Sequence, residues 1–316
     1  MRSRGIVVAV SVIVAAVVCA LGPGGGIARA ALPVSYNFLG GIPSELAHPG
    51  GSLPGSNDFT CTPSAQHPNP VVLVHGTGGA QQTNWGTYVP LLKNEGYCVF
   101  ALTYGTIDGL PFPFTAIGGM APMQDGAAEL GRFISRVLDA TGAQKVDIVG
   151  HSQGTLIPDY YAKYLGGQDE IDKYVSLAPL WNGTTLAGTD LILPVARQLG
   201  VPADGFPICN ACGQFDAASP FMTKLREGGI YLPNIAYTNI STRYDELVVP
   251  YTSGQLPGGA NVHNIVVQDG CPVDYTEHAG LAGSRRGAYF VLNALDPAHP
   301  RPVPCDRAAP ITGSAF

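Results

Sequence analysis

Charged side chains are scarce in this sequence. Lys, Arg, Asp and Glu make up 13% of its 316 residues, about half the share of a typical soluble protein. Basic residues are the scarcer kind, because 17 Lys and Arg face 23 Asp and Glu, which gives a net charge of −6. A broadly basic surface for nucleic acid is therefore excluded, and no nucleic-acid partner is expected.

Several motifs that bind phosphates or metals are also missing. The glycine-rich stretch at residues 75–79 has neither a G-x-G-x-x-G pattern nor a G-K-[ST] ending, so it is not a phosphate loop. Cys209 and Cys212 have no second ligand pair that would complete a zinc site, and no helix-loop calcium pattern is present. The sequence therefore predicts no cofactor and no metal site.

Glycine, proline and apolar residues are abundant instead. The chain has 41 Gly and 27 Pro, and 46% of its residues are hydrophobic. A chain with this much apolar surface to bury is folded rather than disordered, and its glycine and proline content indicates many loops. Its length suits one large α/β domain or two small ones.

The first thirty residues have the pattern of a secretory signal peptide. Arg2 and Arg4 precede an uninterrupted apolar run over residues 5–21, and small residues lead to a cleavage site after Ala30. We expect a secreted chain of residues 31–316, in which 14 Lys and Arg face 23 Asp and Glu for a net charge of −9. A retained membrane anchor is the alternative, because an apolar run of this length is at the lower limit of a bilayer span.

Six cysteines remain once Cys19 is removed with this segment. An even number in an exported chain is typical of disulfides, although six cysteines allow fifteen pairings. Joining each cysteine to its nearest available neighbour predicts Cys61–Cys98, Cys209–Cys212 and Cys271–Cys305. A redox role for Cys209 and Cys212 would require a thioredoxin-like unit, so we interpret this pair as a structural disulfide.

Strands and helices are predicted to alternate through residues 70–316. Apolar runs predict strands at residues 71–75, 97–103, 145–149, 174–178, 234–240 and 262–267. Apolar residues at helical spacing predict helices at residues 84–95, 123–140, 155–165 and 284–295. This alternation predicts one doubly wound, mostly parallel sheet with helices on both faces, whose active site lies beyond the carboxyl ends of the strands.

Three segments do not follow this alternation. Residues 31–69 are rich in Gly, Pro, Ser and Asn, which predicts an extended lead-in. Residues 109–120 are apolar without a period, and residues 180–233 form a long insert; each is either a lid or acyl-binding wall beside the site or a packed surface loop.

Pro158 lies inside a predicted helix and is expected to kink it.

A nucleophile motif lies between a predicted strand and a predicted helix. The sequence Gly150-His151-Ser152-Gln153-Gly154 has the G-x-S-x-G pattern. Glycines flank the serine in this pattern because a sharp strand-to-helix turn has no room for bulky neighbours, and the turn exposes the hydroxyl to a base. The sequence therefore predicts Ser152 as a catalytic nucleophile.

The base that activates this serine is expected after it in the chain. His48, His67 and His75 precede Ser152, His151 adjoins it and is expected to point elsewhere, and His299 lies in a Pro-rich tail. His263 lies inside a predicted strand, whereas His278 lies in the loop that follows. Because catalytic groups lie on loops at strand ends, His278 is the predicted base.

An acid should orient this histidine. Asp245 and Glu246 follow the preceding strand, and Asp245 is the first choice, with Glu246 second. Asp274 follows a different strand and is interpreted as a turn residue.

Backbone amides should stabilise the negative charge that develops during attack. We expect one amide from Gln153, the residue after the nucleophile, and one from Thr77 in the glycine-rich turn after the first strand. The Thr77 hydroxyl is a further candidate donor.

At the level of whole motifs, the chain resembles the secreted class 2 bacterial lipases of the α/β-hydrolase superfamily. The resemblance rests on VVLVHGTGG (71–79), VDIVGHSQG (146–154), RYDELVVP (243–250) and EHAGL (277–281), and it extends over about residues 70–295. Short motifs at Gly76-Thr77-Gly78, Ser152-Gln153-Gly154 and His278-Ala279-Gly280 are also similar to the yeast lipase B type, from which His151 departs.

This resemblance implies an α/β-hydrolase fold over residues 70–316, a Ser152–Asp245–His278 triad and an oxyanion hole at Thr77 and Gln153. It also implies hydrolysis of carboxylic esters of lipids without a cofactor. A polyester hydrolase and an acyltransferase would use the same residues, and a secreted binding protein with an inactive hydrolase fold is the alternative that is not an enzyme. Apolar loops and little charge favour a lipase at a lipid–water interface, and we expect a monomer.

Overall fold

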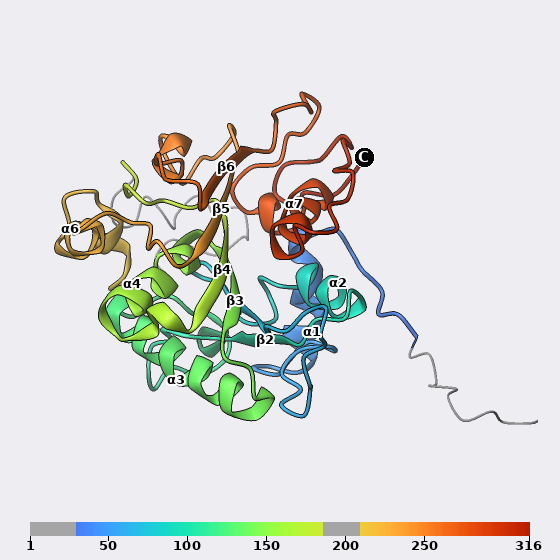
Figure 1. Cartoon of the computed structure of the whole chain (residues 1–316), viewed down its shortest axis with the longest axis horizontal. Helices are drawn as coiled ribbons and strands as arrows, with labels where there is room; N and C mark the ends of the chain where they lie inside the picture. Colours follow the sequence, from blue (N-terminus) through green and yellow to red (C-terminus); the bar gives the residue numbers. More distant parts are fainter. Residues whose placement is uncertain (1–29, 186–208) are drawn as a thin grey trace, which may run out of the picture. The chain divides into compact units, whose positions relative to one another are not determined.

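Six parallel strands form a single sheet in the computed structural model, which describes residues 30–185 and 209–316 (Figure 1). Their order across the sheet is β2-β1-β3-β4-β5-β6, and every neighbouring pair is parallel. The strands are β1 (Val71–Val74), β2 (Val99–Leu102), β3 (Val146–His151), β4 (Ile171–Leu177), β5 (Ala236–Ser241) and β6 (Val262–Val266). The predicted doubly wound α/β fold is confirmed, with all six strands where the apolar runs predict them.

Helices connect and cover these strands. The α-helices in the described ranges are α1 (Ile42–Ala47), α2 (Tyr88–Asn94), α3 (Met123–Thr141), α4 (Ile157–Tyr164), α6 (Pro220–Arg226) and α7 (Arg285–Leu295). Short 3-10 turns are η1 (Phe38–Gly41), η2 (Phe114–Ala116), η3 (Ser152–Thr155), η4 (Gly167–Asp169), η7 (Cys212–Phe215), η8 (Tyr251–Gly254) and η9 (Gly280–Ala282).

Alternating residues of each central strand enter two separate apolar cores. On β1, Val72 and Val74 pack with α3 and α4 on one face of the sheet, whereas Val71 and Leu73 pack with α2 and α7 on the other. Successive side chains of a strand point to opposite faces, so a strand covered on both sides is apolar throughout. This explains why the buried strands read as continuous apolar runs.

Two predicted helices begin later than their apolar spacing suggests. The helix predicted from residue 84 starts at Tyr88, as α2. Before it, Gly86 passes so close to η1 that a Cβ on it would lie 2.4 Å from the Gly41 nitrogen. α4 starts at Ile157 after η3, so Pro158 lies in its first turn. The predicted kink at Pro158 is wrong, because amides of the first turn have no partner within the helix.

Residues 31–69 are not simply extended, contrary to the prediction. They contain η1 and α1, and Pro43 lies in the first turn of α1, where proline favours helix initiation. The Glu45 carboxylate is buried and accepts hydrogen bonds from the Gly50 amide at 2.7 Å and the Gln82 side chain at 2.8 Å. Residues 32–316 form one compact unit, so this segment folds with the sheet rather than apart from it.

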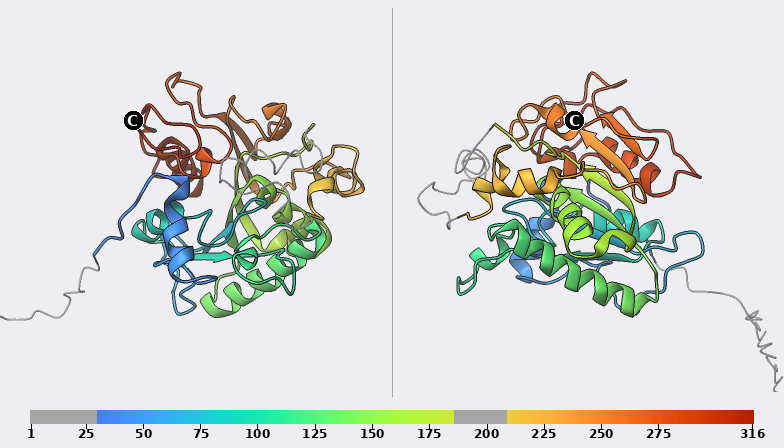
Figure 2. Two further views of the ribbon diagram at one scale, coloured as in Figure 1. Left: turned by 180° about the vertical axis from the view of Figure 1, so that it is seen from behind. Right: turned by 60° about the vertical axis from the view of Figure 1, so that its left-hand side comes forward.

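The two ends of this unit lie side by side (Figure 2). The Phe38 amide donates to the Thr312 carbonyl at 2.8 Å, and the Ser314 hydroxyl donates to the Tyr36 carbonyl at 2.9 Å. The carboxyl-terminal segment therefore holds the start of the described chain in place.

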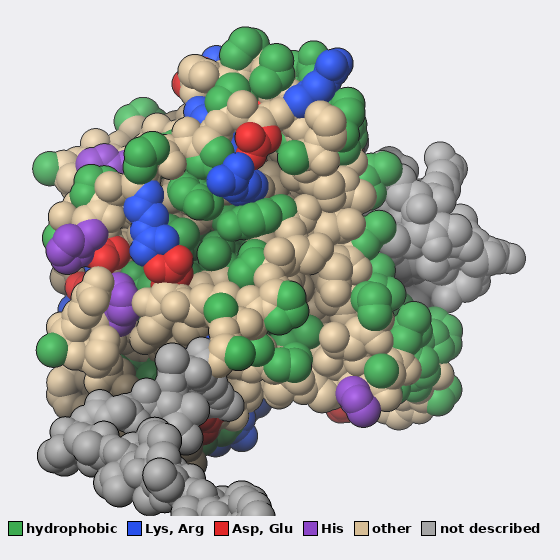
Figure 3. Space-filling model, turned by 90° about the vertical axis from the view of Figure 1, so that its right-hand side faces the viewer, with side chains coloured by type: hydrophobic (Ala, Val, Ile, Leu, Met, Phe, Trp, Pro, Cys, Tyr) green, Lys and Arg blue, Asp and Glu red, His purple; other side chains and the backbone are tan. Residues whose placement is uncertain are grey.

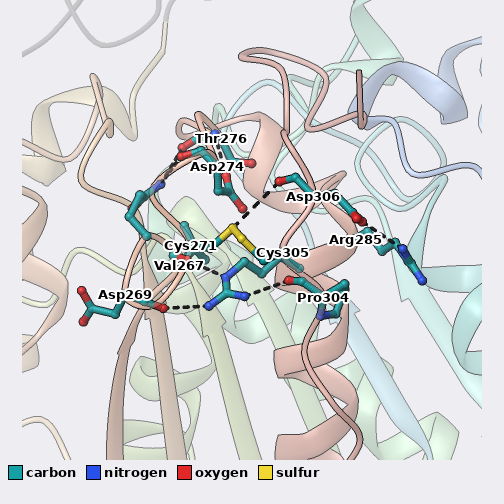
Figure 4. The surroundings of a disulfide bond; sticks show 11 residues. Val267, Asp269, Cys271, Asp274, Thr276, Arg285, Pro304, Cys305 and Asp306 are labelled. Carbon is teal, nitrogen blue, oxygen red and sulfur yellow. Dashed lines mark hydrogen bonds and ion pairs between the residues drawn. A yellow bond between two sulfur atoms is a disulfide. The ribbon is translucent and has the colours of Figure 1, made fainter.

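Three disulfides join the pairs that the sequence predicts, namely Cys61–Cys98, Cys209–Cys212 and Cys271–Cys305. The last lies among Val267, Asp269 and Pro304, beyond the end of β6 (Figure 4). Arg286, from α7, donates to the backbone carbonyls of these three residues at 2.6–2.8 Å. A disulfide and a buried guanidinium thus fix the segments on either side of the loop that contains His278.

Candidate active site

Ser152 lies at a sharp turn directly after β3, in a left-handed backbone conformation. Its φ is 55°, a value that few residues other than glycine adopt and that is typical of strained functional turns. The flanking glycines make the turn possible, since a Cβ on Gly154 would lie 1.9 Å from the Val74 oxygen and one on Gly150 would lie 2.3 Å from the Gly154 oxygen. The turn therefore places Ser152 beyond the carboxyl end of a central strand.

Ser152 faces a cavity of about 360 Å³ that His278 and Thr77 also line. This volume is within the range of small-molecule sites. Most of the remaining wall is apolar and consists of Phe38, Leu39, Ile42, Leu46, Phe112, Pro113, Ala116, Ile117 and Leu247. Residues 109–120 thus supply part of the wall, which is one of the two alternatives that the sequence left open, and η1 with α1 supplies a part that the sequence did not indicate.

His278 is held by Asp245 through its Nδ1 atom. The distances from Nδ1 to the two carboxylate oxygens of Asp245 are 2.9 and 3.0 Å, and both side chains are buried. Asp245 is itself fixed, because its Oδ1 atom accepts hydrogen bonds from the amides of Leu247 and Val248. The structure therefore brings together the serine, the histidine and the carboxylate that the sequence selects.

The charge of Asp245 controls the protonation of His278. Burial disfavours the charged ring, but the charge and hydrogen bonds of Asp245 outweigh burial and raise the pKa of His278 to about 9. In its neutral form the ring can donate from Nδ1 to Asp245 and accept a proton at Nε2. This is the arrangement that a general base requires.

Glu246, the second choice of acid, contacts the main chain of His278 rather than its ring. Its Oε2 atom lies 3.3 Å from the His278 amide. Burial and a hydrogen bond to Glu277 raise the pKa of Glu246. Glu277 in turn accepts hydrogen bonds from the amides of Ala279 and Gly280. The two glutamates therefore fix the backbone of the loop that contains His278, called the histidine loop below.

Asp274 has the turn role that the sequence suggests. It is buried, and its Oδ1 atom accepts a hydrogen bond from the Thr276 amide at 2.8 Å. Asp274 therefore fixes the backbone before His278, whereas the His278 ring is bound by Asp245.

Thr77 and Gln153 lie on the two loops that meet at Ser152. Thr77 lines the cavity, and its buried hydroxyl has no hydrogen-bond partner within the described residues. The Gln153 side chain accepts from the Tyr104 hydroxyl at 2.8 Å and donates to the Gly119 carbonyl at 3.0 Å. The Tyr104 hydroxyl oxygen also lies 2.8 Å from the His75 carbonyl oxygen, so Tyr104 lies between the two loops and contacts both. Nothing in the sequence pattern had indicated this role.

His151 does not point away from the site, and the prediction that it does so is wrong. Its ring lines the cavity, and its Nε2 atom lies 3.0 Å from the main-chain oxygen of His278. Its Nδ1 atom lies 3.0 Å from the side-chain oxygen of Asn84, a residue that the sequence had not singled out. Neither contact could be read from the motif, because both depend on how distant loops fold back.

Apart from His151 and His278, no histidine lines the cavity at Ser152 within the described residues. His75 is fully buried and stacks on Tyr104, and burial lowers its pKa to about 4. His263 is exposed on β6, and His299 pairs with Asp296 in an exposed turn. These positions agree with their exclusion as the base.

The long insert at residues 180–233 is described only in part. Its described residues include α6, whose Phe221, Met222 and Leu225 are buried in the core that contains α4, and none of them lines the cavity at Ser152. This part is a packed surface segment. Residues 186–208 of the insert lie outside the described ranges, as does the leader at residues 1–29.

Within residues 30–185 and 209–316, no cluster of His, Cys, Asp and Glu is arranged to hold a metal ion. No helix in this part of the chain is long and apolar enough to cross a membrane.

Comparison with known proteins identifies relatives of this arrangement. Residues 68–283 match the family model described as Lipase (class 2). The crystal structure of Aspergillus fumigatus lipase B superposes with a TM-score of 0.59 at 19% identity, covering 80% of this chain and 57% of that one. The mature form of Bacillus licheniformis lipase BlEst2 gives a TM-score of 0.49 at 15% identity, with 77% and 94% covered. At these identities the likeness is one of fold, and this chain spans just over half of the Aspergillus protein.

Proposed function

The chain belongs to the class 2 lipase family, and we propose that it is a carboxylic ester hydrolase that cleaves esters of lipids through an acyl-enzyme on Ser152. One observation carries this proposal: Ser152 and His278 line the same apolar cavity, and Asp245 holds the far nitrogen of His278. A nucleophile, a base and a group that orients the base are the three parts of serine-hydrolase catalysis.

The first half of the proposed reaction forms the acyl-enzyme. His278 Nε2 takes the proton of the Ser152 hydroxyl as Oγ attacks the ester carbonyl carbon. The amides of Thr77 and Gln153, with the Thr77 hydroxyl, receive the negative charge of the tetrahedral intermediate. The bond to the alcohol then breaks, and the protonated His278 gives its proton to the departing alcohol.

The second half releases the acid. His278, neutral again, takes a proton from a water molecule as the water oxygen attacks the acyl carbonyl carbon. When the bond between the acyl group and Ser152 breaks, His278 gives this proton to the Ser152 oxygen. Asp245 stabilises the charged ring in both halves. The ester and one water molecule, together with groups of the chain itself, account for every bond and proton in this sequence of steps.

The cavity supports an apolar acyl group as the part of the substrate that it binds. Leu46 of α1 and Phe112 of residues 109–120 both line the cavity, and they are 66% and 44% exposed. Exposed apolar side chains around a binding cavity favour contact with a lipid surface. A lipase is therefore favoured over a polyester hydrolase or an acyltransferase with the same triad. Rates over a series of p-nitrophenyl ester chain lengths, with emulsified triacylglycerol, solid polyester and a sugar acceptor as further substrates, distinguish the three.

We further propose that the chain is exported and cleaved after Ala30. The three disulfides support an oxidising compartment. Amino-terminal sequencing of the protein recovered from the medium of a secreting host should begin at Ala31.

Replacing the nucleophile tests the proposed mechanism. Ser152→Ala should abolish p-nitrophenyl butyrate hydrolysis to within the uncatalysed background while leaving the circular dichroism spectrum unchanged. Ser135→Ala is the matched control, because Ser135 is exposed on α3 and outside the cavity, and it should keep full activity. Undiminished turnover by Ser152→Ala would contradict the assignment of Ser152 as the nucleophile.

A further inference from the structure

His151 lies directly beside the nucleophile and touches the segment that carries the base. Resting on the proposed function, we propose that His151 is a positioning residue: its ring, held by Asn84, donates from Nε2 to the main-chain oxygen of His278 and thereby ties the nucleophile turn to the histidine loop. The Nε2–oxygen distance is 3.0 Å, and the side chain is 4% exposed. A buried hydrogen bond of this length is directional and costly to lose.

The protonation of His151 follows from its two contacts. The His278 carbonyl oxygen can only accept a hydrogen bond, so Nε2 must carry a proton. Burial and the neighbouring His278 lower the pKa of His151 to about 3, so the ring is neutral and holds only that one proton. Its Nδ1 atom is therefore an acceptor.

Asn84 can satisfy this acceptor. The side-chain oxygen of Asn84 lies 3.0 Å from Nδ1, and the side-chain nitrogen has no partner within the described residues. Oxygen and nitrogen of a side-chain amide are assigned from their hydrogen bonds. With the amide turned over, the nitrogen donates to Nδ1, and the 3.3 Å hydrogen bond that the Gly76 amide donates to the oxygen is lost.

The position of this link in the fold explains its effect. His151 is the last residue of β3 and shares a peptide bond with Ser152, whereas the His278 carbonyl belongs to the segment that supplies the base. The two imidazole rings lie 5.1 Å apart, and Phe38 packs edge-on against His151 at 6.1 Å. Movement of the histidine loop away from Ser152 would break the bond to Nε2, so the bond opposes a displacement that misaligns base and nucleophile. Misplacement by about 1 Å can reduce a rate by about 10²-fold.

A purely space-filling role makes a different prediction. Phe fills the volume of the ring without hydrogen bonds, whereas Gln retains an amide N–H that can reach the His278 oxygen. If His151 positions the base, kcat for p-nitrophenyl butyrate should fall about 10²-fold in His151→Phe while KM stays within twofold, and His151→Gln should recover most of the loss. The rate of fluorophosphonate labelling at Ser152 should follow kcat.

His263→Phe is the matched control, because His263 is exposed on β6, and it should behave as wild type. The proposal is overturned if His151→Phe stays within threefold of wild type, if the loss lies in KM, or if Gln is no better than Phe. No turnover by wild type itself would instead contradict the proposed function.

A measurement on the wild-type protein requires no variant to fold. The ¹⁵N chemical shifts of the His151 ring distinguish a protonated from an unprotonated nitrogen. We expect a protonated Nε2 and a bare Nδ1 from pH 5 to pH 9. A protonated Nδ1 with a bare Nε2 would overturn the proposal.

Discussion

Among single residues, His278 is the one whose protonation should set the pH dependence of the proposed reaction. Its Nδ1 atom is bound to Asp245 at 2.9 Å, and the charge of Asp245 raises the pKa of the ring to about 9 despite burial. A ring that already carries its second proton cannot accept one from Ser152. We therefore expect kcat/KM to rise with pH and to reach half its maximum near pH 9, as measured from a pH series on a soluble ester.

Replacing Asp245 should both slow the reaction and move this profile. Asp245→Asn removes the charge that favours the protonated ring, so the midpoint should shift to lower pH, and kcat should fall by about 10⁴-fold, as in comparable triads. Asp139→Asn, an exposed change on α3, should alter neither. A midpoint that stays near pH 9 in Asp245→Asn would show that another group titrates.

Thr77 offers a separate test of charge stabilisation. Its hydroxyl is buried at the cavity without a hydrogen-bond partner in the described part of the chain, which is an unfavourable state unless the reaction uses it. Thr77→Val keeps the shape and should lower kcat by about 10²-fold, with Tm unchanged or higher. Thr77→Ser should retain activity. A Thr77→Val enzyme with normal kcat and lower Tm would assign the hydroxyl to folding alone.

The sequence was informative about residues whose roles depend on local geometry. The turn at Ser152 could be predicted because a strand, two glycines and a helix define it within a few residues. The roles of His151, Asn84 and Tyr104 could not, since each depends on hydrogen bonds to segments far away in the chain.

At the scale of elements, α4 carries a buried acid that is unrelated to the triad. Asp159 is fully buried, its Oδ1 atom lies 3.4 Å from the Tyr237 hydroxyl, and burial raises its pKa from 3.8 to about 8. Between these values the unfolded chain releases a proton that the folded chain keeps. The free energy of unfolding therefore decreases as pH rises from about 4 to about 8.

Asp159→Asn should remove this dependence. We expect its Tm to exceed that of wild type by several degrees at pH 8 and by much less at pH 5, as measured by calorimetry at both values. An equal difference at the two pH values would contradict a neutral Asp159 in the folded state.

Helices and strands were predicted correctly where their apolar residues follow a clear pattern. Prediction failed where an element is short or where its end is not marked by that pattern. The strands and α3 were found because their residues face cores on one or both sides. α1 was missed because six residues are too few to show a helical period. Apolar spacing also did not show that residues 84–87 precede α2, where Gly86 packs against η1.

At the scale of the whole molecule, the small number of charged residues leaves much of the surface uncharged. Figure 3 shows a face on which charged side chains are few and separated by uncharged areas. Leu46 and Phe112 add exposed apolar groups at the cavity. A surface of this kind suits contact with lipid aggregates more than with highly charged partners.

The double variant Leu46→Ser, Phe112→Ser tests this view. Hydrolysis of emulsified triacylglycerol should fall severalfold, because less apolar area is available to enter the interface, while hydrolysis of soluble p-nitrophenyl butyrate stays within twofold. Leu165→Ser is the control, since Leu165 is 44% exposed and does not line the cavity. An equal loss on both substrates would place the effect in the cavity rather than at the lipid surface.

The proposed function depends on acylation of Ser152 during turnover. Peptide mass mapping after treatment with a fluorophosphonate measures whether this serine is the one that reacts. We expect a single adduct on the peptide that contains Ser152, formed in parallel with loss of esterase activity. Loss of activity with the adduct on another residue and none on Ser152 would contradict it.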